Sequence, residues 1–315
     1  MEKKILGGTD LNIAPIVLGG NVFGWTIDEQ QSHTILDNFV ADGFNFIDTA
    51  NMYSVWAPGN KGGESETIIG NWLQKRKKRN DVYIATKVGG DLGYGKSLKK
   101  DYIINQVEYS LTRLKTDYID LYFSHFDDET TPVEETLGAY ETLIKDGKVR
   151  WIGASNFSAA RLEEALLSSK KNQLPQYQVY QPGYNLMDRQ KFESEYKNIC
   201  ADFNLGVVTY FSLASGFLTG KYRDESKLAI SERGNGMKKY LNEQGFKVLN
   251  ALDEIAAQHH TKPASVALAW LMQQPQITAP IASVTGLEQL KSFTAAVRIK
   301  LTVGNVALLN KASSY

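Results

Sequence analysis

The sequence predicts an α/β fold, a (β/α)8 TIM barrel with an N-terminal β-hairpin and extra C-terminal helices. Strand-like and helix-like segments alternate along the chain of 315 residues, which indicates parallel strands joined by helices. Eight such units can be counted, and eight favour a closed barrel over an open sheet. No change of composition and no linker rich in Pro, Gly and Ser divides the chain. Residues 1–315 are therefore expected to form a single domain.

The N-terminal hairpin is expected over residues 3–17, turning at a Gly-Gly-Thr-Asp run whose residue types favour tight turns. After it, short apolar runs with β-branched and aromatic residues recur between helical segments. These strands are expected at residues 16–19, 44–49, 82–87, 119–124, 149–154, 176–181, 206–210 and 278–282.

Helical spacing of apolar residues predicts the connecting helices. They are expected at residues 29–42, 64–75, 99–114, 159–168, 189–202, 240–258 and 263–273, with short helices from about 287 and near 303–312. One more helix begins near residue 131. Thr131 is expected as its N-cap, with Pro132 in the first turn and Glu134 three residues after the cap. Gly147 follows its end, and Ser158 is expected to cap the next helix.

A long irregular segment, roughly residues 211–239, interrupts this alternation. It is rich in Gly, Ser, Lys and Arg, and loops of this length in compact proteins are usually functional or mobile.

The composition is that of a globular protein with no long-range electrostatic field. The chain has 35 Lys and Arg, 35 Asp and Glu, and 43% hydrophobic residues. Because the formal net charge is zero, neither a nucleic acid nor a membrane is expected as a partner.

No apolar run suits a signal peptide or a membrane span, so a cytoplasmic location is expected. Cys200 is the only cysteine, which rules out an internal disulfide and a cysteine-rich zinc site. A buried, inert thiol is expected there.

Polar side chains stand at the ends of three predicted strands. Asp48 ends the strand at 44–49, Lys87 ends the strand at 82–87, and His125 follows the strand at 119–124. Tyr53 follows Asp48 by five positions, on the loop that leaves the strand. Because the active site of such a barrel lies at the carboxyl-terminal rim, these four side chains are expected to form one cluster.

This set suits protonation of an oxygen on which negative charge develops. A free tyrosine has a pKa of about 10, and a lysine ammonium nearby would favour the phenolate and make Tyr53 a better proton donor. Asp48 would hold the ammonium of Lys87, and His125 would orient a substrate carbonyl oxygen. Carbonyl reduction is the indicated reaction, and since no side chain supplies hydride, it requires a nicotinamide cofactor.

Each residue also has an ordinary structural interpretation. A lone Asp at a strand end is more often a turn former, a lone Lys is usually solvated, and a lone His is usually structural. Only the joint pattern at successive strand ends favours a functional site.

Five stretches together resemble the aldo-keto reductases. They are FIDTANMYS with the following GGESETIIGNWL, then YIATKVGG, LTRLKTDYIDLYFSH and GKVRWIGASNFS. The resemblance spans nearly the whole chain and implies a (β/α)8 enzyme that reduces aldehydes and ketones with NADPH. It also implies that Tyr53 is the catalytic acid/base and that Asp48, Lys87 and His125 complete a tetrad.

The resemblance further implies where a dinucleotide binds. Ser155, Asn156 and Gln181 would meet the nicotinamide carboxamide, and Tyr210 would stack on its ring. Backbone N–H groups of the segment SLASGFLTGKYR would meet the diphosphate, and PIASVTGLEQLKSF resembles an adenosine-ribose site. The full set of implied cofactor residues is Gly20, Asn21, Asp48, Ser155, Asn156, Gln181, Tyr210, Ser212, Leu213, Ser215, Gly216, Lys221, Ser283, Thr285 and Gln289.

Two positions depart from the family pattern at the ribose site. Where the family often has a Lys or Arg for the 2′-phosphate, this chain has Gly286, and Phe293 replaces a frequent Asn. Losing a charge-assisted pair costs about 1.5 to 3 kcal/mol. Arg233 and Lys291 are candidates to supply the missing positive charge for the 2′-phosphate. NADP(H) is the expected cofactor, with NAD(H) use left open.

The substrate walls are expected on the rim loops, where Phe23, Trp25, Trp56 and Phe126 supply the apolar surface of a carbonyl pocket. Each of these aromatics could equally serve in the core.

Two alternatives to the reductase come from other classes. The potassium-channel β subunits resemble this branch of the family, so a nicotinamide-binding regulatory or sensor subunit with weak catalysis is the main alternative. A metal-dependent barrel enzyme is disfavoured because the only histidines are His33, His125, His259 and His260, which show no ligand spacing. The substrate itself and the oligomeric state are not indicated.

Overall fold

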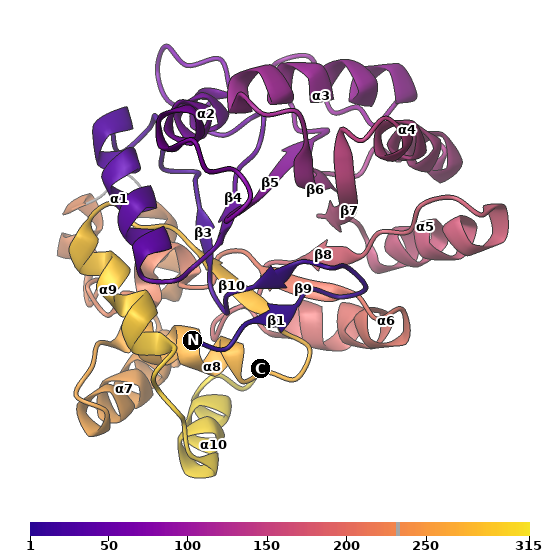
Figure 1. The fold of residues 1–315 in the computed structure, drawn as a ribbon. Helices are drawn as coiled ribbons and strands as arrows, with labels where there is room; N and C mark the ends of the chain where they lie inside the picture. The colour runs from indigo at the N-terminus through magenta and orange to yellow at the C-terminus, as the bar shows by residue number, and fades with distance from the viewer. Residues whose placement is uncertain (231–233) are drawn as a thin grey trace.

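The computed structural model describes residues 1–230 and 234–315, and within them the chain forms a closed barrel of parallel strands (Figure 1). The strand order around the barrel is β10-β3-β4-β5-β6-β7-β8-β9, so the last strand closes on the first. The strands are β3 (Val17–Gly19), β4 (Phe46–Asp48), β5 (Tyr83–Val88), β6 (Ile119–Ser124), β7 (Val149–Ser155), β8 (Val179–Gln181), β9 (Gly206–Thr209) and β10 (Ala279–Ala282). The predicted barrel is confirmed.

Helices surround the strands in Figure 1 and return the chain from the end of one strand to the start of the next. They are α1 (Glu29–Ala41), α2 (Glu64–Arg76), α3 (Lys100–Leu114), α4 (Val133–Lys145), α5 (Ala159–Asn172), α6 (Lys197–Asp202), α7 (Glu243–Gln258), α8 (Pro263–Met272), α9 (Leu287–Ala296) and α10 (Val303–Ala312). In α3, the buried residues Ile103, Val107, Ser110 and Leu114 recur every three or four positions. This spacing places them on one face of the helix, as its sequence predicts.

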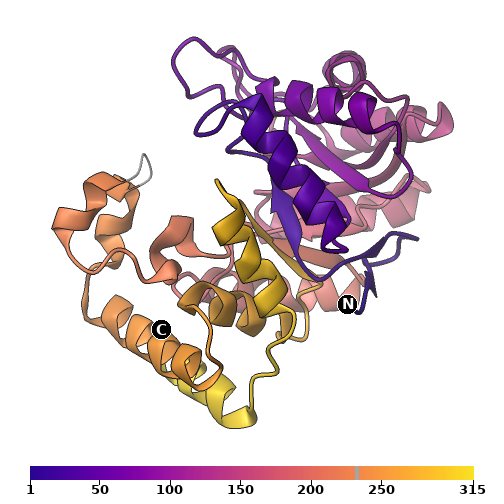
Figure 2. The same ribbon diagram turned by 60° about the vertical axis from the view of Figure 1, so that its left-hand side comes forward.

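In its described residues, the irregular segment before α7 contains short 3-10 turns, η2 (Ala214–Thr219), η3 (Glu225–Ile230) and η4 (Gly234–Tyr240). The backbone of η2 is non-helical at Ser215 and Gly216. Figure 2 shows η3 and η4, in orange, at the edge of the molecule and away from the strands.

Two apolar cores follow from the alternation of side chains along the strands. One lies between the strands and the surrounding helices. The other fills the barrel, where Phe46, Leu121 and Phe123 point inward. The N-terminal hairpin, β1 (Lys4–Ile5) paired antiparallel with β2 (Asn12–Ile13), contributes Leu6, Leu11 and Ile13 to this inner core. The hairpin therefore closes the amino-terminal end of the barrel.

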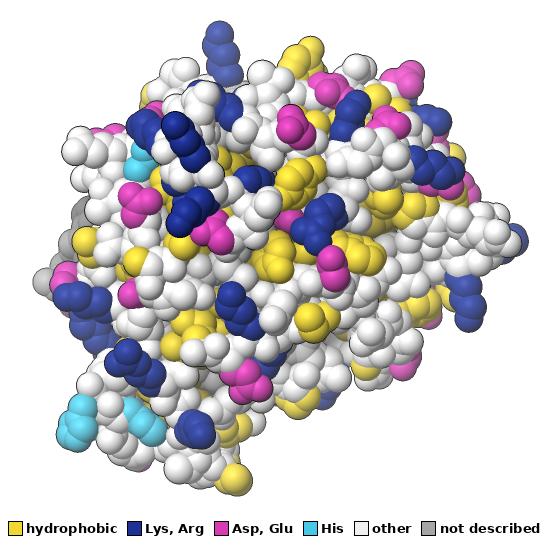
Figure 3. Space-filling view, viewed as in Figure 1, with side chains coloured by type: hydrophobic (Ala, Val, Ile, Leu, Met, Phe, Trp, Pro, Cys, Tyr) yellow, Lys and Arg dark blue, Asp and Glu magenta, His cyan; other side chains and the backbone are white. Residues whose placement is uncertain are grey.

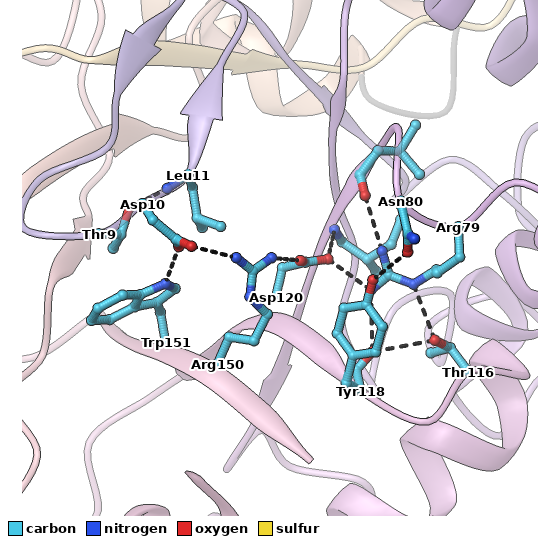
Figure 4. A network of polar contacts seen from close by, with 12 residues as sticks. Thr9, Asp10, Leu11, Arg79, Asn80, Thr116, Tyr118, Asp120, Arg150 and Trp151 are labelled. Carbon is cyan, nitrogen blue, oxygen red and sulfur yellow. Dashed lines mark hydrogen bonds and ion pairs between the residues drawn. The ribbon is translucent and has the colours of Figure 1, made fainter. Parts of the chain in front are cut away.

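A buried carboxylate organises that same end (Figure 4). Asp120 of β6 is 1% exposed, and its two oxygens accept hydrogen bonds from Arg79 Nη2 at 2.7 Å and Arg150 Nη1 at 2.6 Å. Arg150 also donates to Asp10 Oδ2 at 2.8 Å, and Trp151 Nε1 donates to Asp10 Oδ1 at 2.7 Å. Through these contacts the hairpin is tied to β6 and β7.

We expect Asp120→Asn to lower the free energy of unfolding by about 3 kcal/mol, because it leaves two guanidinium groups without their buried counter-charge. Urea denaturation measures the change. Asp81→Asn is the matched control, since both oxygens of Asp81 also accept guanidinium hydrogen bonds, here from Arg76 alone, but Asp81 is solvent-exposed. It should change stability by less than about 1 kcal/mol. Equal effects of the two substitutions would contradict the prediction.

Several details differ from the sequence-based expectation, among them the strand expected at 44–49, which is regular only over Phe46–Asp48. Thr131 does not cap α4: its hydroxyl donates to Asp128 Oδ2 at 2.6 Å, and the helix begins after Pro132 as N-cap. The helix expected at 189–202 is interrupted by a π-helical turn, Phe192–Tyr196, before α6. The strand expected at 176–181 is regular only over its last three residues, Val179–Gln181. Ser158 caps α5 as predicted, accepting a hydrogen bond from Arg161 N.

Charged side chains of both signs intermingle on the face shown in Figure 3, in keeping with the net charge of zero. Cys200 is buried, as expected. Over residues 1–230 and 234–315, no helix has the length and apolarity that crossing a membrane requires.

Candidate active site

Four polar side chains meet at the carboxyl-terminal rim of the barrel. Asp48 is the last residue of β4, Lys87 lies near the end of β5, and His125 follows β6. Tyr53 lies on the loop between β4 and α2. Because β4, β5 and β6 are neighbours in the barrel, their ends bring together groups far apart in the sequence.

Lys87 is the centre of the cluster. Its side chain is fully buried, and its Nζ donates to Asp48 Oδ2 at 2.6 Å, to Tyr53 Oη at 2.8 Å and to the Thr49 carbonyl oxygen at 2.8 Å. All three N–H donors of the ammonium are thereby used. Full satisfaction of this kind is what makes a buried ion pair tolerable.

Tyr53 donates a hydrogen bond from its hydroxyl to Asp48 Oδ2 at 3.0 Å. Burial raises the pKa of Tyr53 well above its usual value of about 10, and the charge of Asp48 raises it further. We expected the ammonium of Lys87 to lower this pKa, but burial and Asp48 outweigh it. Burial also lowers the pKa of Lys87. The phenol is therefore a neutral O–H donor at neutral pH.

His125 lies beside the phenol, with its ring centroid 6.0 Å from that of Tyr53. Burial, together with the charge of Lys87, holds its pKa well below its usual value, so the imidazole is neutral at neutral pH. Its Nδ1 is buried and has no hydrogen-bond partner among the described residues. An unpaired buried nitrogen of this kind is uncommon in a folded protein.

Amide and hydroxyl groups continue the rim past the tetrad. Gln181 Nε2 donates to Asp48 Oδ1 at 3.0 Å, and Ser155 Oγ donates to the Gln181 carbonyl oxygen at 2.9 Å. Asn156 Nδ2 donates to the His125 carbonyl oxygen at 2.8 Å, and Tyr210 Oη donates to Asn156 Oδ1 at 2.8 Å. Of the residues for which the resemblance implies a nicotinamide contact, Gln181 and Asn156 thus bond directly to Asp48 and His125. Ser155 and Tyr210 are linked through them.

Ser283, one of the residues implied at the ribose end, lies where β10 meets β3, next to the implied cofactor residue Asn21. Ser283 donates a hydrogen bond to Asn21 Oδ1, and Gly20 N donates to the Asp48 carbonyl oxygen at 2.8 Å. Gln289 Oε1 accepts from Thr285 N at 2.8 Å, at the start of α9.

The segment after β9 turns sharply around Ser215 and Gly216, whose φ angles are 54° and 108°. Ser212 Oγ donates to the Thr209 carbonyl oxygen, and Gly216 N donates to the Leu213 carbonyl oxygen. Lys221 Nζ lies 4.8 Å from the ring centroid of Tyr222.

The predicted cofactor residues occupy one continuous arc of the rim. The arc runs from the ends of β7, β8 and β9 through β10 to β3, which is the order of the strands around the barrel. It offers amide, hydroxyl, backbone N–H and lysine groups, the donors and acceptors that a dinucleotide requires. The residues present therefore fit a dinucleotide lying beside the tetrad.

The two departures at the ribose end have different surroundings. Gly286 is the N-cap of α9, in extended backbone, and a Cβ there would meet nothing within 4 Å. Phe293 is buried and packs against Phe39 and Phe44, so that position belongs to the core. Lys291 is paired with Glu288 on the same helix. Arg233 lies outside the described residues.

The predicted aromatic walls divide into two groups. Trp56 is 45% exposed, and its ring lies 5.5 Å from that of Trp25 and 6.2 Å from that of Tyr53. Phe126 stacks on His125 with 4.6 Å between centroids. Phe23, in contrast, is fully buried in the core between the strands and the surrounding helices.

The GGESE stretch supplies supporting groups that the sequence argument did not assign. Ser65 Oγ accepts from Thr49 Oγ1 at 2.7 Å and donates to the Gly20 carbonyl oxygen at 2.8 Å. Glu66 is fully buried and accepts from Thr86 and Arg113. The available signal was two polar residues at the start of an apolar helix, directly after the loop that carries Tyr53.

Comparisons with known proteins agree with this geometry. A sequence model of the aldo/keto reductase family matches residues 15–314. The uncharacterized oxidoreductase YrpG of Bacillus subtilis (strain 168) is 35% identical, over 98% of this chain and 95% of its own. A probable voltage-gated potassium channel subunit beta of Oryza sativa subsp. japonica is 32% identical, over 92% of this chain and 89% of its own. The protein tas of Escherichia coli (strain K12) is 31% identical, over 96% and 94%.

A family model that covers almost the entire chain, relatives aligned over nearly their full lengths, and a closed barrel with the expected hairpin lead to one conclusion. The chain belongs to the aldo/keto reductase family.

Proposed function

We propose that this protein is an NADP(H)-dependent oxidoreductase that reduces aldehydes or ketones to alcohols, with Tyr53 as the proton donor. The observation that carries the proposal is the position of the Tyr53 hydroxyl, within hydrogen-bond distance of both buried charges, Lys87 Nζ and Asp48 Oδ2. The nicotinamide supplies the hydride when bound.

The chain's own groups would handle the proton. A carbonyl oxygen that gains negative charge needs a nearby donor, and the neutral Tyr53 phenol is one. As its proton leaves, Lys87 Nζ at 2.8 Å stabilises the phenolate. Asp48 keeps the ammonium in place, and the neutral imidazole of His125 orients the substrate oxygen by a hydrogen bond.

Three further assignments belong to the proposal. The dinucleotide would be held by the continuous arc of rim residues, from Ser155 and Gln181 through the 212–221 segment to Gln289. Trp25, Trp56 and Phe126 would form the substrate walls, because all three remain partly exposed near the phenol. Trp56 lies beside the Tyr53 ring, Trp25 packs against Trp56, and Phe126 stacks on His125. Phe23 is left out, because no part of it reaches solvent.

Two measurements on the purified protein test this function. Fluorescence titration with NADPH and NADH side by side should show saturable binding, tighter for NADPH. Steady-state oxidation of NADPH with simple aldehydes should then show turnover. Absence of binding for both nucleotides would refute the proposal.

A regulatory subunit that binds the nucleotide is the second candidate, supported by the rice relative's name, a probable channel subunit beta. Tight NADPH binding with negligible turnover across aldehydes and ketones would favour it over the reductase.

We expect Gly286→Lys to raise the preference for NADPH over NADH by about tenfold or more, because it adds a cation for the 2′-phosphate where space is open. The start of α9 also favours an anion there. Gly286→Ala is the control, since it adds a side chain without charge. If the two dinucleotides changed affinity together, the 2′-phosphate would lie elsewhere.

A further inference from the structure

The hydroxyl of Tyr210 connects three strand ends of the rim. Tyr210 follows β9, Asn156 follows β7 and His125 follows β6. Tyr210 Oη donates to Asn156 Oδ1 at 2.8 Å, and Asn156 Nδ2 donates to the His125 carbonyl oxygen at 2.8 Å. One side chain, Asn156, thus joins the residue predicted under the nicotinamide to the residue predicted over the substrate.

The direction of these hydrogen bonds is fixed by their partners. A backbone carbonyl oxygen only accepts, so the Asn156 atom that faces His125 must be the NH₂ group. The amide oxygen then faces Tyr210, and the phenol must be the donor. Burial raises the pKa of Tyr210, so its hydroxyl keeps the proton that this contact needs.

The conformation of Asn156 depends on such contacts. Its φ is 56°, in the left-handed region that non-glycine residues enter rarely and at some cost, although Asn tolerates it better than most. Its NH₂ group also donates to Ser155 Oγ at 3.0 Å. Removing the Tyr210 hydroxyl would leave the amide oxygen without this donor and loosen a strained residue.

His125 is held mainly through its backbone. Its N–H donates to the Val88 carbonyl oxygen at 2.7 Å, and its own carbonyl oxygen accepts from Asn156. The ring packs against Tyr53 and Phe126, and its Nδ1 has no hydrogen bond within the described part of the chain. A shift of Asn156 would therefore move the imidazole relative to the phenol.

We propose that the Tyr210 hydroxyl is a positioning group for carbonyl reduction. Through Asn156 it fixes the backbone of His125, and with it the ring that holds the substrate oxygen. The Tyr210 ring has a separate support, because it packs so closely on Gly183 that a Cβ there would lie 3.1 Å from it. The inference rests on the proposed reductase function, since it concerns the substrate side of the same site.

Tyr210→Phe tests it, because the ring stays and only the hydroxyl is lost. We expect kcat/KM for the carbonyl substrate to fall about tenfold, the worth of one good hydrogen bond, while the Kd of NADPH changes less than about twofold. Asn156→Ala should lower kcat/KM at least as much, and the double variant should lose no more than Asn156→Ala alone, because the hydroxyl acts through Asn156.

Tyr118→Phe is the matched control. Its phenol also donates to an asparagine oxygen, Asn80 Oδ1 at 3.1 Å, but at the amino-terminal end of the barrel. It should leave both constants unchanged. Additive losses, wild-type kinetics in Tyr210→Phe, or a loss confined to NADPH affinity would overturn the proposal.

A second readout does not depend on turnover. The chain has four histidines, so the imidazole signals of histidine-labelled protein can be resolved by NMR and that of His125 identified by its absence in His125→Gln. Tyr210→Phe should shift the His125 signal, and an unshifted signal would overturn the proposal. Lack of turnover in the wild-type protein would refute the reductase alone, and this shift would still decide the role of the hydroxyl.

Discussion

Replacing Tyr53 by Phe should reduce kcat by about 10²- to 10⁴-fold, the usual contribution of a positioned general acid. The phenyl ring keeps the contacts with Trp56 and His125, and the pair between Lys87 and Asp48 stays intact. The proton donor is lost, together with its hydrogen bonds to Lys87 Nζ and Asp48 Oδ2. The Kd of NADPH, measured by fluorescence titration, should therefore change less than about twofold.

The titration is also the control for folding of the variant. A Phe variant that binds NADPH normally but retains near-wild-type kcat would mean that the proton comes from another group. Lys87 and His125 would then be the next candidates, because both are titratable side chains beside the phenol.

Lys87→Met should have a large effect on both stability and activity. The variant leaves Asp48 buried without its counter-charge, and breaking a buried pair in this way typically costs about 3 to 5 kcal/mol. Turnover should be nearly lost, because no cation remains to stabilise the Tyr53 phenolate. Urea denaturation and steady-state kinetics measure the two effects separately.

The double variant Asp48→Asn with Lys87→Met distinguishes the effect of the buried charges on stability from the role of the ammonium in the reaction. It removes both charges at once, so we expect it to recover much of the lost free energy of unfolding without recovering turnover. Recovery of activity in the double variant would mean that the ammonium has no role in the reaction. Failure to recover stability would mean that the pair contributes through its hydrogen bonds to Thr49 and Gln181 instead.

Much of the tetrad could be predicted because strand ends are readable from sequence. Asp48, Lys87 and His125 each follow an apolar run, and parallel strands place their carboxyl ends on one rim. The same logic predicts the barrel and its hairpin. It works because periodicity and chain order alone determine these features.

Properties that depend on three-dimensional packing could not be predicted. Whether Lys87 or burial dominates the pKa of Tyr53 depends on how much of the phenol is covered, which no local pattern encodes. Phe23 and Trp25 are two positions apart on an irregular loop, so no period tells which one enters the core.

The prediction that Thr131 caps α4 was wrong for a related reason. The sequence pattern fits a capping box, but the Thr131 hydroxyl donates its hydrogen bond to Asp128, three residues earlier. Likewise, nothing local reveals that the carbonyl of Thr49 is the third acceptor of Lys87.

The network of hydrogen bonds and ion pairs around Asp120, at the amino-terminal end of the barrel, has a practical consequence for engineering. Among the described residues, no side chain of this network takes part in the hydrogen bonds of the carboxyl-terminal rim, because the network lies at the other end of the barrel. Substituting Trp56, on the loop that also carries Tyr53, leaves every contact of the network around Asp120 in place. Substitutions of the rim aromatics can therefore be screened for new substrates without disturbing the contacts that tie the hairpin to the barrel.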